Sequence, residues 1–589
     1  ISPWFAANLR QIDTRGIITT VKPRTGGTRT DSADPAPLGP TGLALGHDSS
    51  VYVADTDHAR VIKLDTLLSG FDGTAFTVAE TDGSVLYEFS ANGLHQRTLH
   101  ALTRQPLYTF TYAQGLPTRI TDGDGNVTQI DYDLAGMPLA LTAPDGQRTE
   151  FTVDANGFLA TTRNPAGETH RFAYTEGGLL TAMTDPRGHT STFQYDNDGR
   201  LLRDTNAAGG GWQLARTNTA TGYHVTMTSA ENRATNYAIE HFSDGGQRRT
   251  DTAPDTTRTI TTEQTDGLTT VRTADGTVQE SNTQPDPRFG SLAAYPGTDK
   301  VTLPSGKQML TTQSRAVTYP GGTPASLRLT DTVTTNGRTG TTVFDQPTRT
   351  LTTTSPQGRT TSSVLDTQGR VTQTTLPGIE PVNRSYDLRG RLNLTSQSSG
   401  ATQRTTQYSY NPQVYLDTVT DAINRNTRFE YDLAGRVTKQ TLPDNRIIQF
   451  AYDSQGNLTA LVPPGRDAHE FRYNAVDLED EYTPPDLVTG RTITQYMYNL
   501  DKQLELITRP DGQTIDLEYD NAGRLSRRVV PNGVYQFAYH ATTGQLSALA
   551  APGGQTLNYT YDGVLPVSET WNGAINGTVS RTYDNNFWL

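Results

Sequence analysis

The stretch Gly188-His189-Thr190-Ser191-Thr192-Phe193-Gln194-Tyr195-Asp196-Asn197-Asp198-Gly199-Arg200 sets the pattern of this 589-residue chain. Reduced to a template, it is a Gly, six residues, Tyr-Asp, two residues, and then Gly-Arg. The template recurs along the sequence at a nearly fixed period. A period of this size is typical of repeat architectures, in which each repeat is one small supersecondary unit.

The Tyr position of the template recurs in steps of 21 residues through most of the chain. It falls at Tyr132, Val153, Tyr174 and Tyr195, then at Leu365 and Tyr386, at Tyr410, Tyr431, Tyr452 and Tyr473, and, with steps of 20 to 22, at Tyr498, Tyr519, Tyr539, Tyr561 and Tyr583. We expect the tyrosines to pack neighbouring repeats and the glycines four places later to close turns. The structural positions we single out are Tyr132, Tyr174, Tyr195, Tyr386, Tyr431, Tyr452, Tyr519, Gly136, Gly199, Gly390, Gly435 and Gly523.

Each repeat is predicted to be a β-hairpin. An apolar residue stands two places before the Tyr, as in Phe193/Tyr195 and Phe450/Tyr452, and a spacing of two puts both side chains on one face of a strand. The residues after the Tyr form a turn, because Asp bonds its own backbone at the entry and Gly accepts positive φ at the exit. A second turn, such as Pro144-Asp145-Gly146, closes the unit.

Composition limits the classes of function. Hydrophobic residues make up 34% of the chain, which is few for its length and suits long strands whose two faces are both partly wet. Disorder is the competing explanation, but aromatic residues recur in register. The net charge of −13 argues against nucleic acid as a partner, and the absence of Cys excludes disulfides and thiol chemistry. No apolar run approaches the length of a membrane span.

The chain divides into two predicted domains. Residues 1–70 contain short alternating strands, such as Val51-Tyr52-Val53-Ala54-Asp55 and Arg60-Val61-Ile62-Lys63-Leu64, and closely resemble the last part of an NHL β-propeller. Residues 71–589 are the hairpin array. The template fades at about 206–350, where we expect degenerate hairpins with longer loops, and a small inserted domain is the alternative. No helix of any length is predicted.

The Gly-x6-Tyr-Asp-x2-Gly-Arg template resembles the YD, or RHS, repeat family, over residues 85–205 and 355–589. A propeller followed by such repeats is similar to the teneurin arrangement, and the absence of Cys suits a bacterial member. The resemblance implies an all-β fold in which YD-repeat hairpins form one long, spiralling β-sheet closed into a hollow shell. The pattern of the self-cleaving core that ends the array in some members does not occur in residues 1–589, so that closing core is absent from this sequence and no self-cleaving residue is assigned.

Two functions follow from the resemblance. The first is a non-enzymatic shell or scaffold of a secreted or surface-displayed, teneurin-like protein, which mediates adhesion to an extracellular protein or glycan. The second is an encapsulating shell that sequesters a C-terminal, toxin-like domain of the same polypeptide until delivery. An enzyme acting on polysaccharide is a third hypothesis, without support from paired catalytic carboxylates.

No residue is predicted to be catalytic, to bind a cofactor or to ligate a metal. The ten His residues are scattered without metal-ligand spacing. The stretch Asp122-Gly123-Asp124-Gly125-Asn126 resembles the opening of a calcium loop but lacks the Glu of its twelfth position, and it falls where the repeat needs a turn. Arg200, Arg370, Arg391, Arg436 and Arg524 follow the turn Gly, and we expect them to pair with the Asp of the Tyr-Asp position in a structural ladder.

Overall fold

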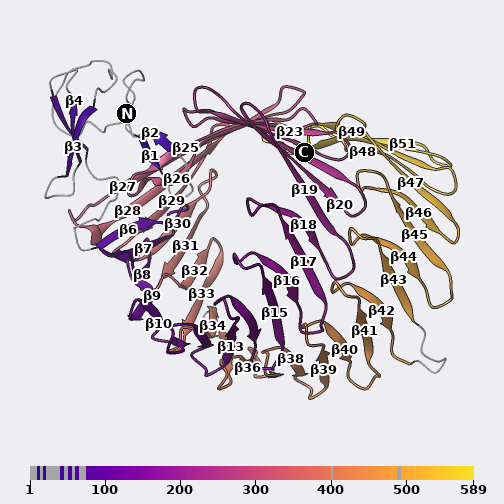
Figure 1. The fold of residues 1–589 in the computed structure, drawn as a ribbon, viewed down its shortest axis with the longest axis horizontal. Coiled ribbons are helices and arrows are strands. Elements are labelled where there is room, and N and C mark those ends of the chain that lie inside the picture. The colour runs from indigo at the N-terminus through magenta and orange to yellow at the C-terminus, as the bar shows by residue number, and fades with distance from the viewer. Residues whose placement is uncertain are drawn as a thin grey trace.

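The computed structural model describes residues 75–399, 402–486 and 493–589, together with five short strands before residue 75 (Figure 1). Strands β1 (Arg10–Ile12) and β2 (Ile18–Thr20) pair with each other, and β3 (Pro40–Leu45), β4 (Val51–Asp55) and β5 (Arg60–Leu64) form a separate antiparallel sheet. Most of residues 1–70, where the propeller segment is expected, lie outside the described residues. The propeller therefore stays a prediction.

The remaining strands form one antiparallel sheet of 46 strands. The first group covers the clear N-terminal repeats: β6 (Ala75–Ala79), β7 (Val85–Ser90), β8 (His95–His100), β9 (Pro106–Ala113), β10 (Leu116–Asp122), β11 (Val127–Tyr132), β12 (Pro138–Thr142), β13 (Arg148–Val153), β14 (Leu159–Arg163), β15 (Thr169–Tyr174), β16 (Leu180–Thr184), β17 (Thr190–Tyr195) and β18 (Leu201–Thr205). The middle group covers the degenerate region: β19 (Gly211–Asn218), β20 (Gly222–Ser229), β21 (Ala234–His241), β22 (Gln247–Thr252), β23 (Arg258–Glu263), β24 (Thr269–Arg272), β25 (Val278–Asp286), β26 (Gly290–Thr302), β27 (Gln308–Thr318), β28 (Arg328–Thr335) and β29 (Arg338–Asp345).

The third group covers the C-terminal repeats: β30 (Thr350–Thr354), β31 (Thr360–Leu365), β32 (Val371–Leu376), β33 (Ile379–Tyr386), β34 (Leu392–Ser399), β35 (Thr402–Tyr410), β36 (Leu416–Thr420), β37 (Asn426–Tyr431), β38 (Val437–Thr441), β39 (Ile447–Tyr452), β40 (Leu458–Val462), β41 (His469–Tyr473), β42 (Glu479–Thr483), β43 (Thr494–Tyr498), β44 (Leu504–Thr508), β45 (Thr514–Tyr519), β46 (Leu525–Val530), β47 (Gly533–Tyr539), β48 (Leu546–Ala550), β49 (Thr556–Asp562), β50 (Leu565–Asn572) and β51 (Gly577–Ser580).

The sheet is an open ribbon, which corrects the expectation that the sheet itself closes. Every strand from β7 to β50 pairs with the strand before and the strand after it, whereas β6 is paired with β7 and β51 with β50. The expectation of an all-β array is confirmed. In the described part of the chain the one helical element is a single 3-10 turn, η2 (Pro324–Ser326).

The degenerate middle region is part of the same ribbon. Strands β18 to β30 pair in unbroken succession, so the alternative of an inserted domain is wrong for these residues. The template fades because the strands lengthen: β26 has 13 residues and β27 has 11, against five or six in the regular repeats. Longer strands move the turns apart and remove the period of 21.

Both hairpin turns of a regular repeat have the same backbone geometry. In the turn Asp196–Arg200, the Asp196 N–H donates to the Arg200 carbonyl at 2.9 Å and the Gly199 N–H to the Asp196 carbonyl at 3.1 Å. The turn Asp185–His189 repeats these bonds at 2.9 and 3.0 Å. This is a type I turn followed by one left-handed residue, which is why Gly199 has φ 79° and Gly188 φ 91°.

The strands keep one face half-buried and the other wet. Along β17, Ser191, Phe193 and Tyr195 are half-buried while the residues between them are exposed. The register shifts by one residue just before the Tyr, since Gln194 lies opposite Arg203 but Tyr195 opposite Leu201. A bulge of this kind bends a strand and increases its twist. Its recurrence in each regular repeat favours a ribbon that curls.

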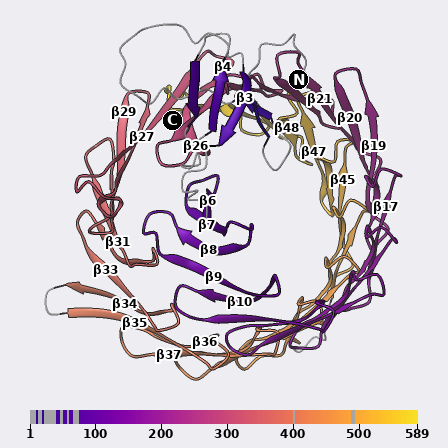
Figure 2. The ribbon, with the colours of Figure 1, turned by 60° about the vertical axis from the view of Figure 1, so that its left-hand side comes forward.

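The ribbon winds into a ring-shaped wall (Figure 2). We call residues 116–345 the first winding and residues 350–589 the second winding. In Figure 2, strands β17 to β20 of the first winding run beside β45 to β48 of the second, and β6 to β10 cross the middle of the view.

Buried apolar residues are few and gather where the first hairpins meet the wall. One cluster joins Leu86 on β7 and Leu99 on β8 to Phe289 and Ala293. Phe289 directly precedes β26, and Ala293 lies on it. A second cluster, around Phe344, packs Leu102 against β28 to β31. Close by, Asp286 is fully buried between Arg288 and Arg315, at 2.9 and 2.8 Å. The rest of the wall is held by strand pairing and polar contacts.

Candidate functional site: the seam between the windings

The two kinds of hairpin turn lie on opposite edges of the ribbon. Turns that follow the Tyr position, such as Asp196–Arg200, form what we call the Tyr edge. Turns of the Pro-Asp-Gly kind, such as Asp185–His189, form the Pro edge. Because the ribbon winds, the Pro edge of the first winding meets the Tyr edge of the second. We call this line of contact the seam.

The seam follows the wall over most of the first winding. Its polar contacts between Pro-edge and Tyr-edge residues join Asp124 to Arg370, Asn126 to the Arg389 carbonyl, Gln147 to Tyr415, Glu168 to Arg436, Arg187 to Asp477, Arg233 to Asp501, Asp255 to Arg524, Ser305 to Asp562, and Asn336 to Asn586. Each pair joins residues that are about half the chain apart. The seam thus fastens the ribbon edge to edge.

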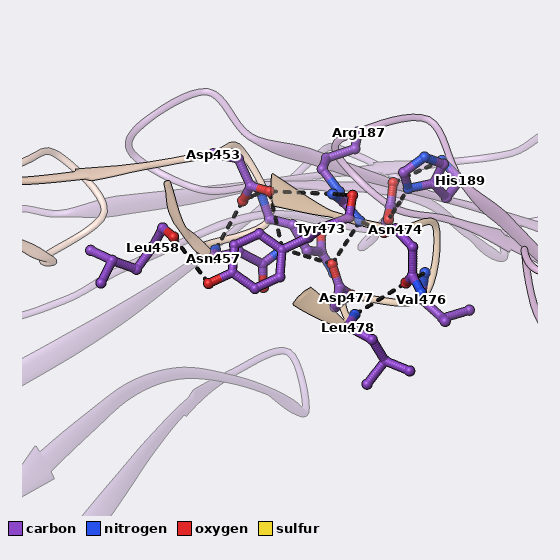
Figure 3. A network of polar contacts seen from close by, with 12 residues as sticks. Arg187, His189, Asp453, Asn457, Leu458, Tyr473, Asn474, Val476, Asp477 and Leu478 are labelled. Carbon is purple, nitrogen blue, oxygen red and sulfur yellow. Dashed lines mark hydrogen bonds and ion pairs between the residues drawn. The ribbon is translucent and has the colours of Figure 1, made fainter. Parts of the chain in front are cut away.

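The Arg187 network is one of the polar contacts that make the seam (Figure 3). Arg187 donates to the carbonyls of Tyr473 and Asn474, at 3.2 and 2.5 Å, and to the Asp477 carboxylate at 2.9 Å. Its guanidinium also lies 3.5 Å from Asp453. One side chain of the first winding therefore binds two successive Tyr-edge turns of the second.

Asn457 completes this network from within the second winding. Its amide donates to Asp453 at 3.0 Å and to Asp477 at 2.8 Å. Burial raises the pKa of Asp453, but the hydrogen bonds from Asn457 and Gln455 and the Arg187 charge outweigh burial, so the pKa lies below its usual value. Asp453 is accordingly a carboxylate, and the seam here is an ion-pair network.

Asp477 occupies the position that is Gly in the regular repeat. Its φ is 61°, in the left-handed region that non-Gly residues seldom adopt, although Asp and Asn tolerate it best. The side chain that replaces Gly reaches across the seam to Arg187. The departure from the template supplies a contact that Gly could not make.

The arginines after the turn Gly act as latches where they face the seam. Arg370, Arg436 and Arg524 each bind the Asp of their own turn at 2.7 Å. Each also lies over the next Tyr ring, 4.7, 5.2 and 4.3 Å from the centroids of Tyr386, Tyr452 and Tyr539. The free end of each guanidinium reaches Asp124, Glu168 or Asp255, at 2.8, 2.8 and 2.6 Å.

The expected pairing of these arginines with the Asp of the Tyr-Asp position is confirmed. That Asp stands four residues earlier, in the same turn as the arginine. Arg391 pairs with Asp387 in this way at 2.7 Å. Arg200 lies on the Tyr edge of the first winding, away from the seam, and binds Asp196 and Asp198 of its own turn, at 3.6 Å in the case of Asp196.

Most of the singled-out tyrosines donate their hydroxyl to the preceding hairpin. The acceptors are the carbonyls of Pro117 for Tyr132, Leu180 for Tyr195, Val371 for Tyr386, Leu416 for Tyr431, Val437 for Tyr452 and Leu504 for Tyr519, at 2.7 to 2.9 Å. Tyr174 instead packs against Phe158, with ring centroids 5.3 Å apart. The tyrosines tie successive hairpins together along the Tyr edge.

The singled-out glycines all occupy left-handed turn positions. Gly136, Gly199, Gly390, Gly435 and Gly523 have φ between 79° and 83°. Gly390 lies at the seam itself, where a Cβ would overlap the Asp124 carboxylate, 2.1 Å away. Gly136 and Gly199 lie on the free Tyr edge and meet only side chains of the neighbouring repeat.

The stretch resembling a calcium loop is a Pro-edge turn. Asp122 accepts hydrogen bonds from the backbone of Asp124 and Asn126, at 3.0 and 2.8 Å, and Asp124 binds Arg370. Its carboxylates are therefore occupied by donors of the protein. Across the ranges that the structure describes, no group of three or more His, Cys, Asp or Glu side chains is placed to hold a metal ion. No helix in the same ranges has the length and apolar character of a membrane span.

Sequence reasoning missed the residues that make the seam. Arg187, Glu168, Asp255, Asp453 and Asp477 were not singled out. A signal was available in two of them, because Arg187 replaces the Asp of the Pro-Asp-Gly turn and Asp477 replaces the Gly of the Tyr-Asp turn. Departures from a repeat template mark positions at which a repeat meets something other than its neighbour.

This geometry defines a class of protein: a β-hairpin repeat ribbon that is wound and fastened along its edges. The chain belongs to the teneurin YD-shell family, whose family model matches residues 73–589. Among curated relatives, Teneurin-1 of Gallus gallus is 33% identical over 99 residues, and Teneurin-3 of Mus musculus is 35% identical over 98 residues. Each alignment covers 16% of this chain and only 4% of the relative's own length.

Two solved structures align with most of this chain at low sequence identity. The TcdB2-TccC3-Cdc42 structure aligns with 88% of this chain and 41% of its own, at 12% identity and a TM-score of 0.35. The Photorhabdus luminescens Tc holotoxin pore aligns with 89% of this chain and 31% of its own, at 13% identity and a TM-score of 0.34.

Proposed function

We propose that this chain is the non-enzymatic shell of a secreted or surface-displayed, teneurin-like protein, and that it serves adhesion or interaction. The observation that carries this proposal is the seam. In a ribbon that did not wind, side chains such as Arg187 and Arg436 would be free to bind or react. Here they form ion pairs that fasten one winding to the next. A wall built in this way is a rigid support for the surface it presents.

In this proposal, residues 71–589 form the shell and residues 1–70 are the end of an NHL propeller. The shell fixes the relative positions of surface loops, and an extracellular protein or glycan is the partner. The test is binding of the purified chain to a panel of cells and extracellular proteins, followed by mapping of the contact with hydrogen exchange. Protection confined to the outer surface of the wall supports an adhesion scaffold.

Encapsulation of a C-terminal, toxin-like segment of the same polypeptide is the second candidate. It is favoured by the seam as well, because a ribbon fastened edge to edge makes a continuous wall. The discriminating experiment is a cryo-EM map of the intact parent protein. Density of the C-terminal segment inside the wall supports encapsulation, and a wall empty of that segment contradicts it and leaves the adhesion role standing.

A further inference from the structure

Strands β6 to β9, which we call the first hairpins, cross the middle of the ring and contact the wall through the segment Leu99–Thr103 (Figure 2). Ala101 is 1% exposed and belongs to the cluster around Phe289. Leu102 packs against the cluster around Phe344. This segment therefore anchors the first hairpins in both buried clusters of the wall.

The one titratable residue of the anchoring segment, His100, makes a contact that requires a neutral imidazole. The Thr103 N–H donates to His100 Nδ1 at 3.2 Å, and the Thr103 hydroxyl lies 3.2 Å from the same nitrogen. A backbone N–H can only donate, so Nδ1 accepts and the single ring proton is on Nε2. A second proton on Nδ1 would face the Thr103 N–H, donor against donor.

The other side of the His100 ring packs on the second winding. A Cβ on Gly369 would lie 2.6 Å from Nε2 and 2.8 Å from Cδ2, so the ring rests directly on the backbone of this turn. No water fits between the ring and the glycine to solvate an added charge. His100 thus joins the first hairpins to the wall at a place from which solvent is excluded.

The charges nearest to the ring come from its own turn and from the turn that it packs on. Arg104, in its own turn, is an exposed cation. Asp366, in the Gly369 turn, is bound by Arg370 at 2.7 Å. Burial lowers the pKa of His100, and the Asp366 charge raises it only in part, so the pKa lies below its usual value.

The remaining charges face the histidine across a cavity of about 230 Å³ between the first hairpins and the wall. The wall contributes Arg288, Arg315 and Asp331, and the turn between β6 and β7 contributes Asp82. Arg315 holds both oxygens of Asp331, at 2.7 and 2.8 Å. Asp82 is exposed and accepts from the Ser84 N–H at 2.8 Å. The two arginines disfavour a further cation, and the wall carboxylate is already bound.

We propose that His100 is an acid-sensitive anchor, and that its protonation detaches the first hairpins from the wall. The added proton breaks the contact with the Thr103 N–H and puts a third cation beside Arg288 and Arg315. The inference goes beyond the proposed function and holds for either of its two candidates.

The pH range of the detachment follows from proton linkage. In the detached state, His100 is solvated and takes up its proton with an ordinary pKa of about 6.5. The attached state takes up that proton only at lower pH, because burial lowers the pKa. Between the two values the detached state binds more protons, so acid favours detachment. The seam carboxylate Asp453 has a pKa below the ordinary 3.8, so the wall stays fastened in this range.

The test is hydrogen exchange of the purified chain at about pH 7.5 and about pH 5.5, read by mass spectrometry and corrected for the intrinsic effect of pH. We expect exchange in β7 and β8 to rise roughly threefold or more relative to β39 and β40. His100→Gln keeps an acceptor for the Thr103 N–H and does not titrate, so it should abolish the rise. The matched control is His540→Gln, an exposed turn histidine, which should leave the rise unchanged.

Three results of this experiment would overturn the proposal. They are an unchanged exchange of β7 and β8 in acid, an equal rise in β39 and β40, and an acid response that persists in His100→Gln. If that variant does not fold, exchange of the histidine C2 hydrogen in the unsubstituted chain, mapped by peptide, gives the pKa of His100 directly. A value below about 6.5 supports the anchor, and a value at or above it overturns the proposal.

Discussion

The Arg524 guanidinium donates a hydrogen bond of 2.6 Å to the Asp255 carboxylate across 269 residues of sequence. The same guanidinium binds Asp520 of its own turn at 2.7 Å and lies 4.3 Å from the centre of the Tyr539 ring. One side chain thus joins its own turn, the next repeat and the other winding. The stability of the seam should depend on such residues individually.

Replacing Arg524 tests the latch. Arg524→Met leaves Asp255 without its partner, and we expect a loss of about 1–3 kcal/mol in the free energy of unfolding, the usual range for hydrogen bonds to charged groups. Urea denaturation measures the loss. Arg425→Met is the control, because Arg425 is well exposed and, within the described ranges, its ion pair is with Asp421 of its own turn. It should cost less than about 0.5 kcal/mol, and an equal cost for both variants would contradict the latch role.

The hydroxyl of Tyr452 should stabilise the Tyr edge. It donates to the Val437 carbonyl at 2.9 Å, so Tyr452→Phe is expected to cost about 1 kcal/mol. Tyr108 makes no such bond among the described residues and is 48% exposed, so Tyr108→Phe should be nearly neutral. Thermal and urea denaturation of the two variants measure the difference. No difference between them would show that the tyrosines act only through their rings.

Relief of the backbone strain at Val414, which has φ 62° at the Gly position of the template, should stabilise the protein. Val414→Gly removes a β-branched side chain from the left-handed region, and we expect a gain of roughly 1 kcal/mol after the entropy of Gly is subtracted. The reciprocal change, Gly435→Val, puts a Cβ 2.3 Å from the Tyr415 hydroxyl oxygen at a φ of 83°, and should destabilise. Urea denaturation of both variants decides the sign, and destabilisation by Val414→Gly would refute the strain argument.

The backbones of the two windings should be in direct contact at Gly210. A Cβ there would lie 2.0 Å from the Leu500 carbonyl oxygen, so Gly210→Ala forces the windings apart at a cost of about 1–3 kcal/mol. We expect faster hydrogen exchange in the turn after Tyr498. Gly177→Ala is the matched control, because its Cβ meets nothing closer than 3.9 Å on the free Tyr edge. Unchanged exchange in the Gly210 variant would mean that the seam does not close there in solution.

The seam should weaken in acid. In Asp453 and Asp520, burial raises the pKa, but hydrogen bonds and a neighbouring arginine outweigh it and lower both pKa values below the ordinary 3.8. A carboxylate whose pKa is lowered by folding contributes its full stabilisation at pH values above its pKa in the unfolded state. This stabilisation is lost as the pH falls through the pKa of the folded state. We therefore expect stability that is flat near neutral pH and falls below about pH 4. Asp453→Asn should reduce that fall, as measured by urea denaturation at several pH values.

The hairpin repeat could be predicted from the sequence because its determinants are local. The turn at Asp196–Arg200 needs an Asp whose side chain accepts a hydrogen bond from the turn backbone and a Gly with positive φ. Both residues can be recognised in the sequence. The alternation of Phe193 and Tyr195 with polar residues likewise fixes which side chains share a face. The expected pairing of Arg with the Asp of the Tyr-Asp position is confirmed, and it is local as well, because both residues belong to one turn.

The sequence by itself determined the strands, the turns and the tyrosine contacts, since each depends on residues within about one repeat. Only the tertiary structure decided the seam. Arg200 and Arg436 stand in the same local template, yet Arg200 binds the acids of its own turn while Arg436 reaches Glu168 in the other winding. The difference arises from the curvature and pitch of the whole ribbon. These determine which turns of the first winding lie against which turns of the second. The twist of many successive strands adds up to that curvature, so no single repeat encodes it.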